Sequence, residues 1–433
     1  MTSIARPHGP SLASRLAFRF LVAYVALFLL AEHAVGFGAL LGLWGSDPLF
    51  GAYAAFGRTL FGVECERHFN GSGDTSYHWV RFGSNLLLAT AATAAWAAVD
   101  RCRPNHPRLR DGLWIALRFL LATTMLSYGL GKFGDGQFSP PIALQLLQPM
   151  GQSSPMGLLW FFMGSSAPYT AFTGVIELAG AFLLAFRRTQ LLGALWTAAA
   201  MANVFALNLC YDVPAKILSF HLLAFALVIA SPDAARLARM FVRNVPVPAV
   251  DLEGPWTRPS LRRFGFGCKV AWLGLATAAV LFVLFVGPPH AGQGGPEAEL
   301  RATWEVAEFR RDGVEVPPLT TDATRWGHVA FVEDWPMGLA IVKPMTGDLA
   351  HWFWSAADGV LTLHAVAQGD DGRLQPGEVQ GALRYTRDGD RGLRFDGELN
   401  GARTEVVCKR IDREDFPLVQ RGFRWVSERP FNR

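Results

Sequence analysis

Seven long apolar stretches dominate the N-terminal part of the chain. Each approaches the ~20 residues that a helix needs to cross a ~30 Å hydrocarbon layer. The first stretch continues past Glu32 and His33 without a small-x-small cleavage site, so we expect a membrane anchor rather than a signal peptide. The predicted spans cover 17–37, 79–99, 113–133, 167–187, 189–210, 214–231 and 268–287.

Two further apolar segments lie between the predicted spans. Residues 48–62 are too short and too interrupted to cross a bilayer, and we expect an interfacial helix there. Residues 141–163 break at Gly151 and at Pro155, which predicts a half-helix, a loop and a second half-helix. This second segment either lies on the membrane, caps a cavity or forms an ordinary packed loop.

The C-terminal part has a different pattern, because apolar and polar residues alternate there with a period of two. Short alternating segments separated by Asp-Gly, Gly-Asp and Asn-Gly dipeptides indicate antiparallel hairpins. We predict a small all-β barrel or sandwich at 301–433, with Trp304 in its core. Such a barrel either holds one small apolar ligand or is filled by side chains. The tail at 412–433 alternates aromatic residues with arginines. This pattern suits docking on lipid headgroups or on an acidic rim of the membrane domain, or folding back onto the barrel.

Charge and composition set the orientation and the domain limits. Hydrophobic residues make up 51% of the chain, and arginines gather in alternate loops, as at Arg187 and Arg188. The positive-inside rule therefore places the N-terminus in the cytoplasm and the β-domain outside. The net charge of +4 reflects this orientation, and we expect lipid rather than nucleic acid as the partner. The predicted organisation is an α-helical membrane domain at 1–288, a linker at 289–300 and a β-domain at 301–433.

The five cysteines form no CxxC or CxxCH motif, which argues against a thiol relay or a covalently attached haem. Cys65 and Cys210 both fall on the predicted outer face, where a disulfide can persist. Sequence alone does not show whether they are close. We expect no metal site.

Polar residues inside the predicted spans are costly and therefore mark candidate sites. Helix direction places most of them in the outer half of the membrane, with Glu177 deepest. We expect a polar cavity that opens outward, with Glu177 at its floor and lysines near its mouth. The candidates for chemistry are Glu177, Lys132, Lys216 and His221, and the candidates for ligand binding are Tyr128, Asn203, Asn208, Asp212 and Asp74.

Each candidate also has a structural interpretation. Glu177 is expected to be paired with a lysine or protonated, whereas Lys132 and Lys216 can instead snorkel to the interface. His221 can be a satisfied histidine of the bundle, and Arg118 is expected to be a snorkelling anchor.

Two aspartates near helix ends have capping as their structural interpretation. Asp74 in NGSGDTSYHW (70–79) either caps the second span or contacts a ligand. Asp212 in the short YDVPAK connection can cap the sixth span, with Pro214 in its first turn.

Motifs in the third to sixth spans match a known family. YGLGKF (128–133) fits a Gly-x-x-Lys-aromatic pattern at a helix end, and IELAGAFLLAFRRTQLLGAL (176–195) fits a Glu, Gly, apolar run and basic turn. On these motifs, residues 113–231 resemble the DoxX-like family of bacterial membrane proteins. MGSSAPYTAFTG (163–174) and YDVPAKILSFHLL (211–223) resemble a longer subgroup with a similar C-terminal extension.

The resemblance implies a four-helix DoxX-like core to which the first, second and seventh spans are added. It implies a multi-pass protein of the bacterial inner membrane, with a periplasmic β-domain. Relatives include subunits linked to quinone-dependent thiosulfate oxidation and membrane redox complexes, and the wider group includes vitamin K-dependent carboxylases and lipase maturation factors. Lys132 and Glu177 are the polar residues that match the family.

The leading functional hypothesis is a membrane protein that handles a quinone-type redox molecule, with a membrane redox subunit as partner. Glu177 would move protons, while Lys132 or Lys216 would stabilise an anionic oxygen. An alternative hypothesis is a non-enzymatic maturation or assembly factor that holds an exported protein. A solute carrier ranks last, because no inverted repeat is evident. The sequence leaves open whether the protein is an enzyme.

Overall fold

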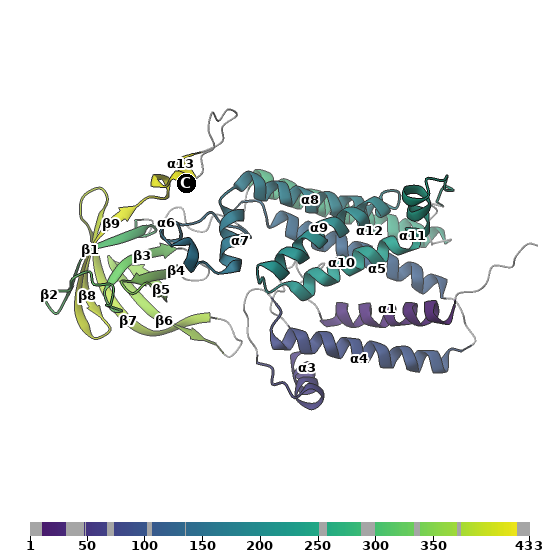
Figure 1. Cartoon of the computed structure of the whole chain (residues 1–433), viewed down its shortest axis with the longest axis horizontal. Helices are drawn as coiled ribbons and strands as arrows, with labels where there is room; N and C mark the ends of the chain where they lie inside the picture. The colour runs from purple at the N-terminus through teal and green to yellow at the C-terminus, as the bar shows by residue number, and fades with distance from the viewer. Residues whose placement is uncertain are drawn as a thin grey trace, which may run out of the picture. The chain divides into compact units, whose positions relative to one another are not determined.

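The computed structural model divides the chain into two compact units, which we describe separately (Figure 1). One unit comprises Met1–Phe138 and Ala167–Gly287, and the other comprises Ser139–Ser166 and Pro288–Arg433. The first is helical and the second is built on a β-barrel, which confirms the predicted fold class. The residues that the structure describes are 11–31, 47, 49–66, 73–101, 106–134, 136–250, 258–286, 299–332, 338–369 and 374–421.

The described part of the helical unit contains seven helices that are long and apolar enough to cross a membrane. All seven overlap the predicted spans, so this is a multi-pass membrane protein by length and composition. Glu32, His33 and the rest of the first predicted span beyond Ala31 lie outside the described residues. The helices are α1 (Leu12–Ala31), α4 (Ser76–Val99), α5 (Pro107–Leu130), α8 (Ala167–Ala185), α9 (Gln190–Cys210), α10 (Lys216–Ala230) and α12 (Pro259–Phe285).

Shorter helices extend or connect these spans. The predicted helix at 48–62 is confirmed as α3 (Phe50–Phe56) followed by the π-helix η1 (Gly57–Phe61). That it lies at the membrane interface stays a prediction. Beyond α10 the chain continues through η3 (Ser231–Asp233), α11 (Ala234–Leu237) and η4 (Ala238–Val242).

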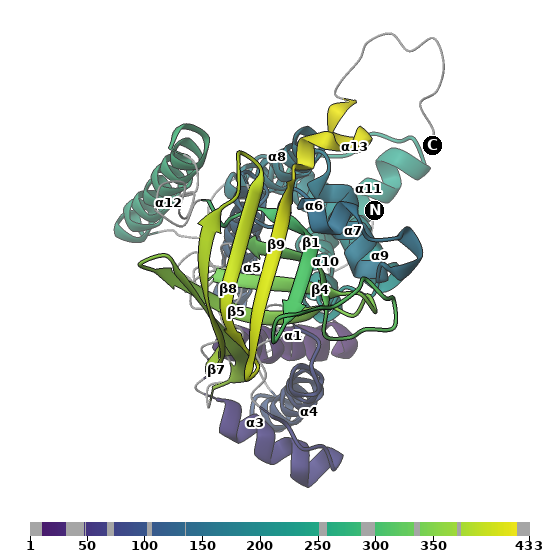
Figure 2. The ribbon, with the colours of Figure 1, turned by 90° about the vertical axis from the view of Figure 1, so that its left-hand side faces the viewer.

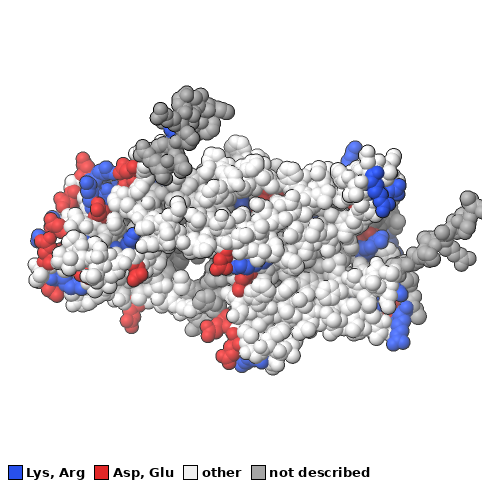
Figure 3. Space-filling view, in the orientation of Figure 1, with Lys and Arg blue, Asp and Glu red and all other residues white. Residues whose placement is uncertain are grey.

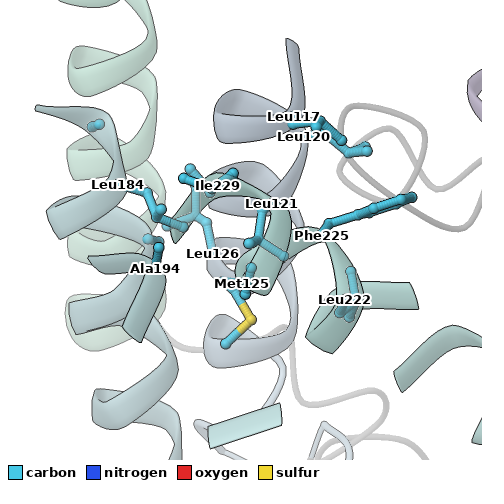
Figure 4. Packing of buried hydrophobic residues seen from close by; sticks show 14 of the residues in the cluster. Leu117, Leu120, Leu121, Met125, Leu126, Leu184, Ala194, Leu222, Phe225 and Ile229 are labelled. Carbon is cyan, nitrogen blue, oxygen red and sulfur yellow. The ribbon is translucent and has the colours of Figure 1, made fainter. Parts of the chain in front are cut away.

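Helix α5 lies at the centre of the bundle. Its Leu117, Leu121 and Met125 are fully buried. Figure 4 shows these side chains among residues of the neighbouring helices, including Leu184 of α8 and Phe225 of α10. By contrast, α12 buries little more than Trp272 and Ala276, so most of its surface is left for lipid.

The β-unit is a closed antiparallel barrel. Neighbouring strands follow each other in sequence from β3 to β9, and β1 pairs with both β3 and β9, which closes the barrel (Figure 2). It is therefore a barrel and not a sandwich. The strands are β1 (Thr303–Arg311), β2 (Val314–Glu315), β3 (Trp326–Val332), β4 (Gly338–Pro344), β5 (Ala350–Ala357), β6 (Val360–Gln368), β7 (Leu374–Arg387), β8 (Gly392–Leu399) and β9 (Ala402–Ile411).

Tight turns with positive φ set the strand register. The predicted Asp-Gly and Asn-Gly hairpins are confirmed, since both residues of each pair have positive φ at Asp312–Gly313, Asp358–Gly359 and Asn400–Gly401. This conformation matches the twist of the flanking strands. Inside the barrel, buried side chains such as Phe309, Phe331 and Trp304 pack together, so the prediction that Trp304 is a core residue is confirmed.

The segment between α5 and α8 belongs to the barrel unit, a grouping that the sequence did not predict. It forms α6 (Ala143–Leu146), the 3₁₀ turn η2 (Met150–Gln152) and α7 (Pro155–Gly164), which confirms the half-helix, loop, half-helix pattern. The Leu144 amide donates to the Thr303 hydroxyl (3.3 Å), which ties α6 to the barrel.

The C-terminal end of the barrel unit continues as η5 (Arg413–Asp415) and α13 (Pro417–Gln420). The aromatic and basic residues of the predicted tail from 422 onward lie outside the described residues.

The two units differ in how many charged residues lie on their surfaces. Figure 3 shows red and blue residues crowding the barrel, while the middle of the helical unit is almost entirely white on the face in view. An uncharged band of this kind is what a lipid-facing bundle requires.

Candidate functional site

Helices α5 and α8 cross at two glycines. A Cβ on Gly129 would lie 3.0 Å from the Leu178 side chain, and a Cβ on Gly174 would lie 2.9 Å from the carbonyl oxygen of Gly129. The two backbones can approach this closely only because both positions lack a side chain. The glycines of the sequence motifs therefore set the distance between the two helices.

The closest buried ion pair in the described part of the bundle forms one turn from this crossing. Lys132 Nζ lies 2.6 Å from Glu177 Oε2, and the residues are only 8% and 5% exposed. The pairing of Glu177 with a lysine is thus confirmed, and the prediction that Lys132 snorkels to the interface is wrong. The reason is geometric, because the glycine crossing brings Glu177 within reach. Tyr128, one turn before Lys132, is half-buried.

Side-chain hydrogen bonds hold the hairpin of α9 and α10. Asn208 Nδ2 donates to Ser219 Oγ (3.0 Å) and to the carbonyl oxygen of Ala215 (3.1 Å). Both donor hydrogens of the Asn208 amide are therefore used. Asn203 is exposed and makes no side-chain hydrogen bond with another described residue, so the structure does not bring it together with Asn208.

Asp74 caps α10 and not the helix that follows it. Its Oδ2 accepts from the backbone amide of Lys216 (2.6 Å) and its Oδ1 from that of Ile217 (3.0 Å). Asp74 itself has φ +58°, a conformation that aspartate tolerates better than most residues. The prediction that Asp74 caps the second span is therefore wrong, because its turn directs the carboxylate at another helix.

Asp212 and Lys216 form an ion pair instead of the predicted cap. Lys216 Nζ donates to Asp212 Oδ1 at 2.9 Å, and the Asp212 side chain is 84% exposed. The prediction that Asp212 caps α10 is wrong, since Asp74 already satisfies the first amides. Helix α10 begins at Lys216, so Pro214 precedes the first turn rather than lying in it.

His221 lies in an aromatic cage and bonds to Tyr24. Its Nδ1 donates to the carbonyl oxygen of Ile217 (2.6 Å), so in the neutral ring Nε2 accepts from the Tyr24 hydroxyl (2.5 Å). The rings of Phe28 and Phe82 lie 4.8 and 5.4 Å from the imidazole. His221 is therefore a satisfied histidine, and its partner Tyr24 was missed because single-sequence patterns do not show which helices are neighbours.

A second polar cluster near the start of α4 also escaped the sequence analysis. Arg81 is buried, its Nη1 donates to the carbonyl oxygen of Ala31 (3.2 Å), and it lies 3.8 Å from Asp47. Tyr77 donates to the same carboxylate. Burial in this region raises the pKa of Tyr53 in α3. The sequence signal for this cluster was Arg81, a charged residue inside an otherwise apolar span.

Arg118 caps the C-terminal end of α8. Its Nε and Nη2 donate to the carbonyl oxygens of Leu184 (2.9 Å) and Ala185 (3.1 Å), and its Nη1 to Gln190 Oε1 (3.1 Å). A cation at a helix C-terminus stabilises the unpaired carbonyls. The snorkelling prediction for Arg118 is wrong, because the side chain is buried against these groups.

Cys65 and Cys210 are both free, so the suggested disulfide is absent. Burial raises the pKa of the Cys65 thiol above its ordinary value, which disfavours the thiolate. Within the described ranges, no group of three or more His, Cys, Asp or Glu side chains is arranged to hold a metal ion.

Cavities among the described residues include an apolar one in the helical unit and a polar one in the barrel. One of about 490 Å³ is an apolar groove between α1, α4 and α10, and one of about 520 Å³ lies among Arg384, Asp396 and Arg403 of the barrel. Neither is lined by Lys132, Glu177, Lys216 or His221. The outward polar cavity with Glu177 at its floor stays a prediction.

Comparisons with known proteins place part of this chain beside a bacterial protein. The chain is 29% identical over 139 residues to the uncharacterized protein YwoB of Bacillus subtilis (strain 168), which is 32% of this chain and 88% of that protein. No protein-family model matches the chain. No solved structure matches it.

Proposed function

We propose that this protein handles a quinone-type redox molecule in a membrane oxidoreductase system, with Lys132 and Glu177 as the groups that exchange protons. The observation that carries the proposal is their buried ion pair, 2.6 Å long, inside the spanning bundle. A charged pair buried in a membrane bundle is costly to keep, and such groups mark proton relays and substrate pathways among other functional sites. Tyr128, a turn from Lys132, is the nearest candidate for contact with the molecule.

The chemistry follows from the two charge states of the pair. A quinone takes up protons as well as electrons on reduction, and a quinol releases both on oxidation. As a carboxylate, Glu177 accepts a proton from a quinol hydroxyl, and Lys132 then becomes available to stabilise the anionic oxygen that is left. A separate membrane redox subunit supplies or removes the electrons. In this view the protein provides binding and proton transfer.

The proposed location is the bacterial inner membrane, with the N-terminus in the cytoplasm and the barrel in the periplasm. The arginine distribution supports this orientation, since Arg187 and Arg188 follow α8 at the end opposite to Lys132. The similarity of residues 113–231 to DoxX-like proteins also supports it.

The test is mass spectrometry of an organic extract of the full-length protein purified in detergent. We expect a stoichiometric quinone in the wild type and its loss in Glu177→Gln. Asp212→Asn is the matched control, because it removes an exposed carboxylate from the same unit. If the extract of the wild type holds bulk lipid alone, the quinone proposal is wrong.

A second candidate function is an assembly factor for exported proteins. It is favoured by large apolar side chains that stay exposed on the segment packed with the barrel, namely Met150 (78% exposed), Phe162 (58%) and Leu158 (39%). In the proposed orientation the barrel unit faces water, where exposed apolar groups mark binding surfaces. Crosslinking in intact cells tests this function by comparing the proteins captured by the wild type with those captured by the double variant Leu158→Ser/Met150→Ser. If both capture the same proteins, this surface does not bind them.

A further inference from the structure

The helix that begins with α10 is longer than a membrane crossing requires. Helical backbone continues from Lys216 to Val242 through η3, α11 and η4, a length of 27 residues. At about 1.5 Å per residue this helix is about 40 Å long, whereas the hydrocarbon layer is about 30 Å thick. The excess is about two turns, which correspond to residues 234–243. We call these residues the terminal extension of α10.

The terminal extension is not packed into the core of the helical unit. No residue of α11 or η4 is buried. Phe241 is 73% exposed and Val242 is 82% exposed. A segment that directly follows a span and leaves large apolar side chains uncovered is suited to the boundary between headgroups and acyl chains.

The terminal extension is amphipathic. Arg236, Arg239 and Arg243 recur at intervals of three and four residues, so they share one face of the helix. Leu237 and Phe241 are four residues apart and share another face. When such a helix lies at the membrane surface, its apolar face contacts acyl chains and its arginines stay among the headgroups.

Two of the three arginines have no carboxylate partner among the described residues. Arg236 pairs with Asp233, whereas Arg239 and Arg243 are exposed and form no ion pair or side-chain hydrogen bond with another described residue. Residues 234–250 contain no Asp or Glu. On the face in view, Lys and Arg side chains gather at the end of the helical unit where Figure 1 draws α11, with few acidic residues among them (Figure 3).

These features select an anion that belongs to a lipid. Guanidinium groups bind phosphate oxygens through paired hydrogen bonds, so two uncompensated arginines favour a phosphate. The exposed Phe241 on the same short segment requires an apolar environment beside that phosphate. A phospholipid supplies both groups in one molecule.

We propose that the terminal extension binds phospholipids whose headgroup carries a net negative charge, with Arg239 and Arg243 on the phosphate and Phe241 among the acyl chains. A zwitterionic headgroup has its own cation, which the arginines repel, so such lipids bind less well. This site holds the end of α10 at the bilayer surface. It is independent of Lys132 and Glu177 and of the quinone proposal.

The experiment measures which lipids stay bound to the full-length protein. The protein is reconstituted in mixed phosphatidylglycerol and phosphatidylcholine, released in a mild detergent, and analysed by native mass spectrometry. We expect the wild type to retain phosphatidylglycerol in preference. Arg239→Gln/Arg243→Gln should lower the ratio of bound phosphatidylglycerol to phosphatidylcholine about fivefold for each arginine removed. Both side chains are exposed, so the fold should be unaffected.

The matched control is Arg108→Gln/Arg110→Gln, which removes the same charge from exposed positions at the start of α5 and should leave the ratio unchanged. Phe241→Ser keeps the charge of the terminal extension and removes its largest exposed apolar group. It should lower the amount of bound phosphatidylglycerol several-fold.

Three results would overturn the proposal. Equal retention of the two lipids by the wild type removes the selectivity for negative headgroups. An equal fall of the ratio in both double variants assigns the preference to the overall charge of the bundle and not to the terminal extension. Displacement of the lipid by glycerol phosphate or by an RNA oligonucleotide makes the terminal extension a site for a soluble phosphate or for a nucleic acid.

Discussion

Lys132, in the turn that follows α5, donates a 2.6 Å hydrogen bond to Glu177 of α8. Both residues lie one helical turn from the close contact between Gly129 and Gly174. The two features depend on each other. Without the close glycine crossing the side chains would have to reach further, and without the pair a buried charge would remain in the bundle. Stability measurements can separate these two contributions.

Removing one partner of the ion pair should destabilise the protein more than removing both. Lys132→Met or Glu177→Gln alone leaves an uncompensated buried group, at a cost of about 3–5 kcal/mol. The double variant Lys132→Met/Glu177→Leu replaces the pair with apolar groups and should recover most of the loss. Thermal unfolding midpoints in detergent check this. If the double variant is as unstable as the sum of the single variants, the pair does not act as a unit.

Alanine at either glycine of the crossing should also destabilise the bundle. The new Cβ of Gly174→Ala meets the Gly129 carbonyl oxygen at 2.9 Å, a backbone atom that cannot rotate away, so we expect a loss of about 1–3 kcal/mol. Gly112→Ala in the same α5 is the control, since nothing lies within 4 Å of its Cβ. It should be neutral or stabilising by up to about 1 kcal/mol. If Gly174→Ala and Gly112→Ala destabilise the protein equally, the close crossing of α5 and α8 is contradicted.

The cap of α10 provides a third prediction. Asp74→Ala removes the acceptor for two backbone amides and should cost about 1 kcal/mol. Asp212→Asn removes the charge of an exposed surface pair and tolerates the positive φ of this position, so it should cost about 0.5 kcal/mol or less. Unfolding midpoints of the two variants are compared with that of Asp74→Asn, which keeps an acceptor and tolerates positive φ. A larger effect for Asp212→Asn than for Asp74→Ala would mean that the cap is misassigned.

The barrel should lose stability as the pH falls below about 6.5, the ordinary pKa of histidine. Burial lowers the pKa of His328 on β3, so the folded state binds a proton less readily than the unfolded state. The barrel is therefore less stable at low pH, because the free energy of unfolding rises with pH wherever the unfolded state holds more protons. Hydrogen exchange of barrel peptides in the full-length protein, between pH 5 and pH 7.5, should show a smaller change for His328→Gln than for the wild type. An equal change in both would assign the effect to other groups.

Local patterns predicted the elements well. Each span is a long apolar run, and hydrophobic length alone determines a membrane helix because the bilayer thickness is constant. The hairpins followed from pairs such as Asp358–Gly359 and Asn400–Gly401, since the turn conformation is a property of adjacent residues. The presence of a partner for Glu177 was also predictable, because an isolated charge is too costly at that depth.

Contacts between elements could not be read in the same way. The sequence did not distinguish Lys132 from Lys216 as the partner of Glu177, and it assigned the capping of α10 to Asp212 rather than Asp74. It also gave no indication of Tyr24 beside His221. Helical periodicity shows which residues share a face, but the crossing of two helices and their rotation decide which faces meet.

The amino-acid sequence by itself determined that the chain is a multi-pass membrane protein with an all-β C-terminal domain, because span length, turn residues and alternation act locally. The tertiary structure decided that the β-domain closes into a barrel through β1 and β9, and that Ser139–Ser166 packs with it. It also decided which polar side chains satisfy one another. These outcomes depend on packing between segments that are distant in sequence, where no local pattern carries the information.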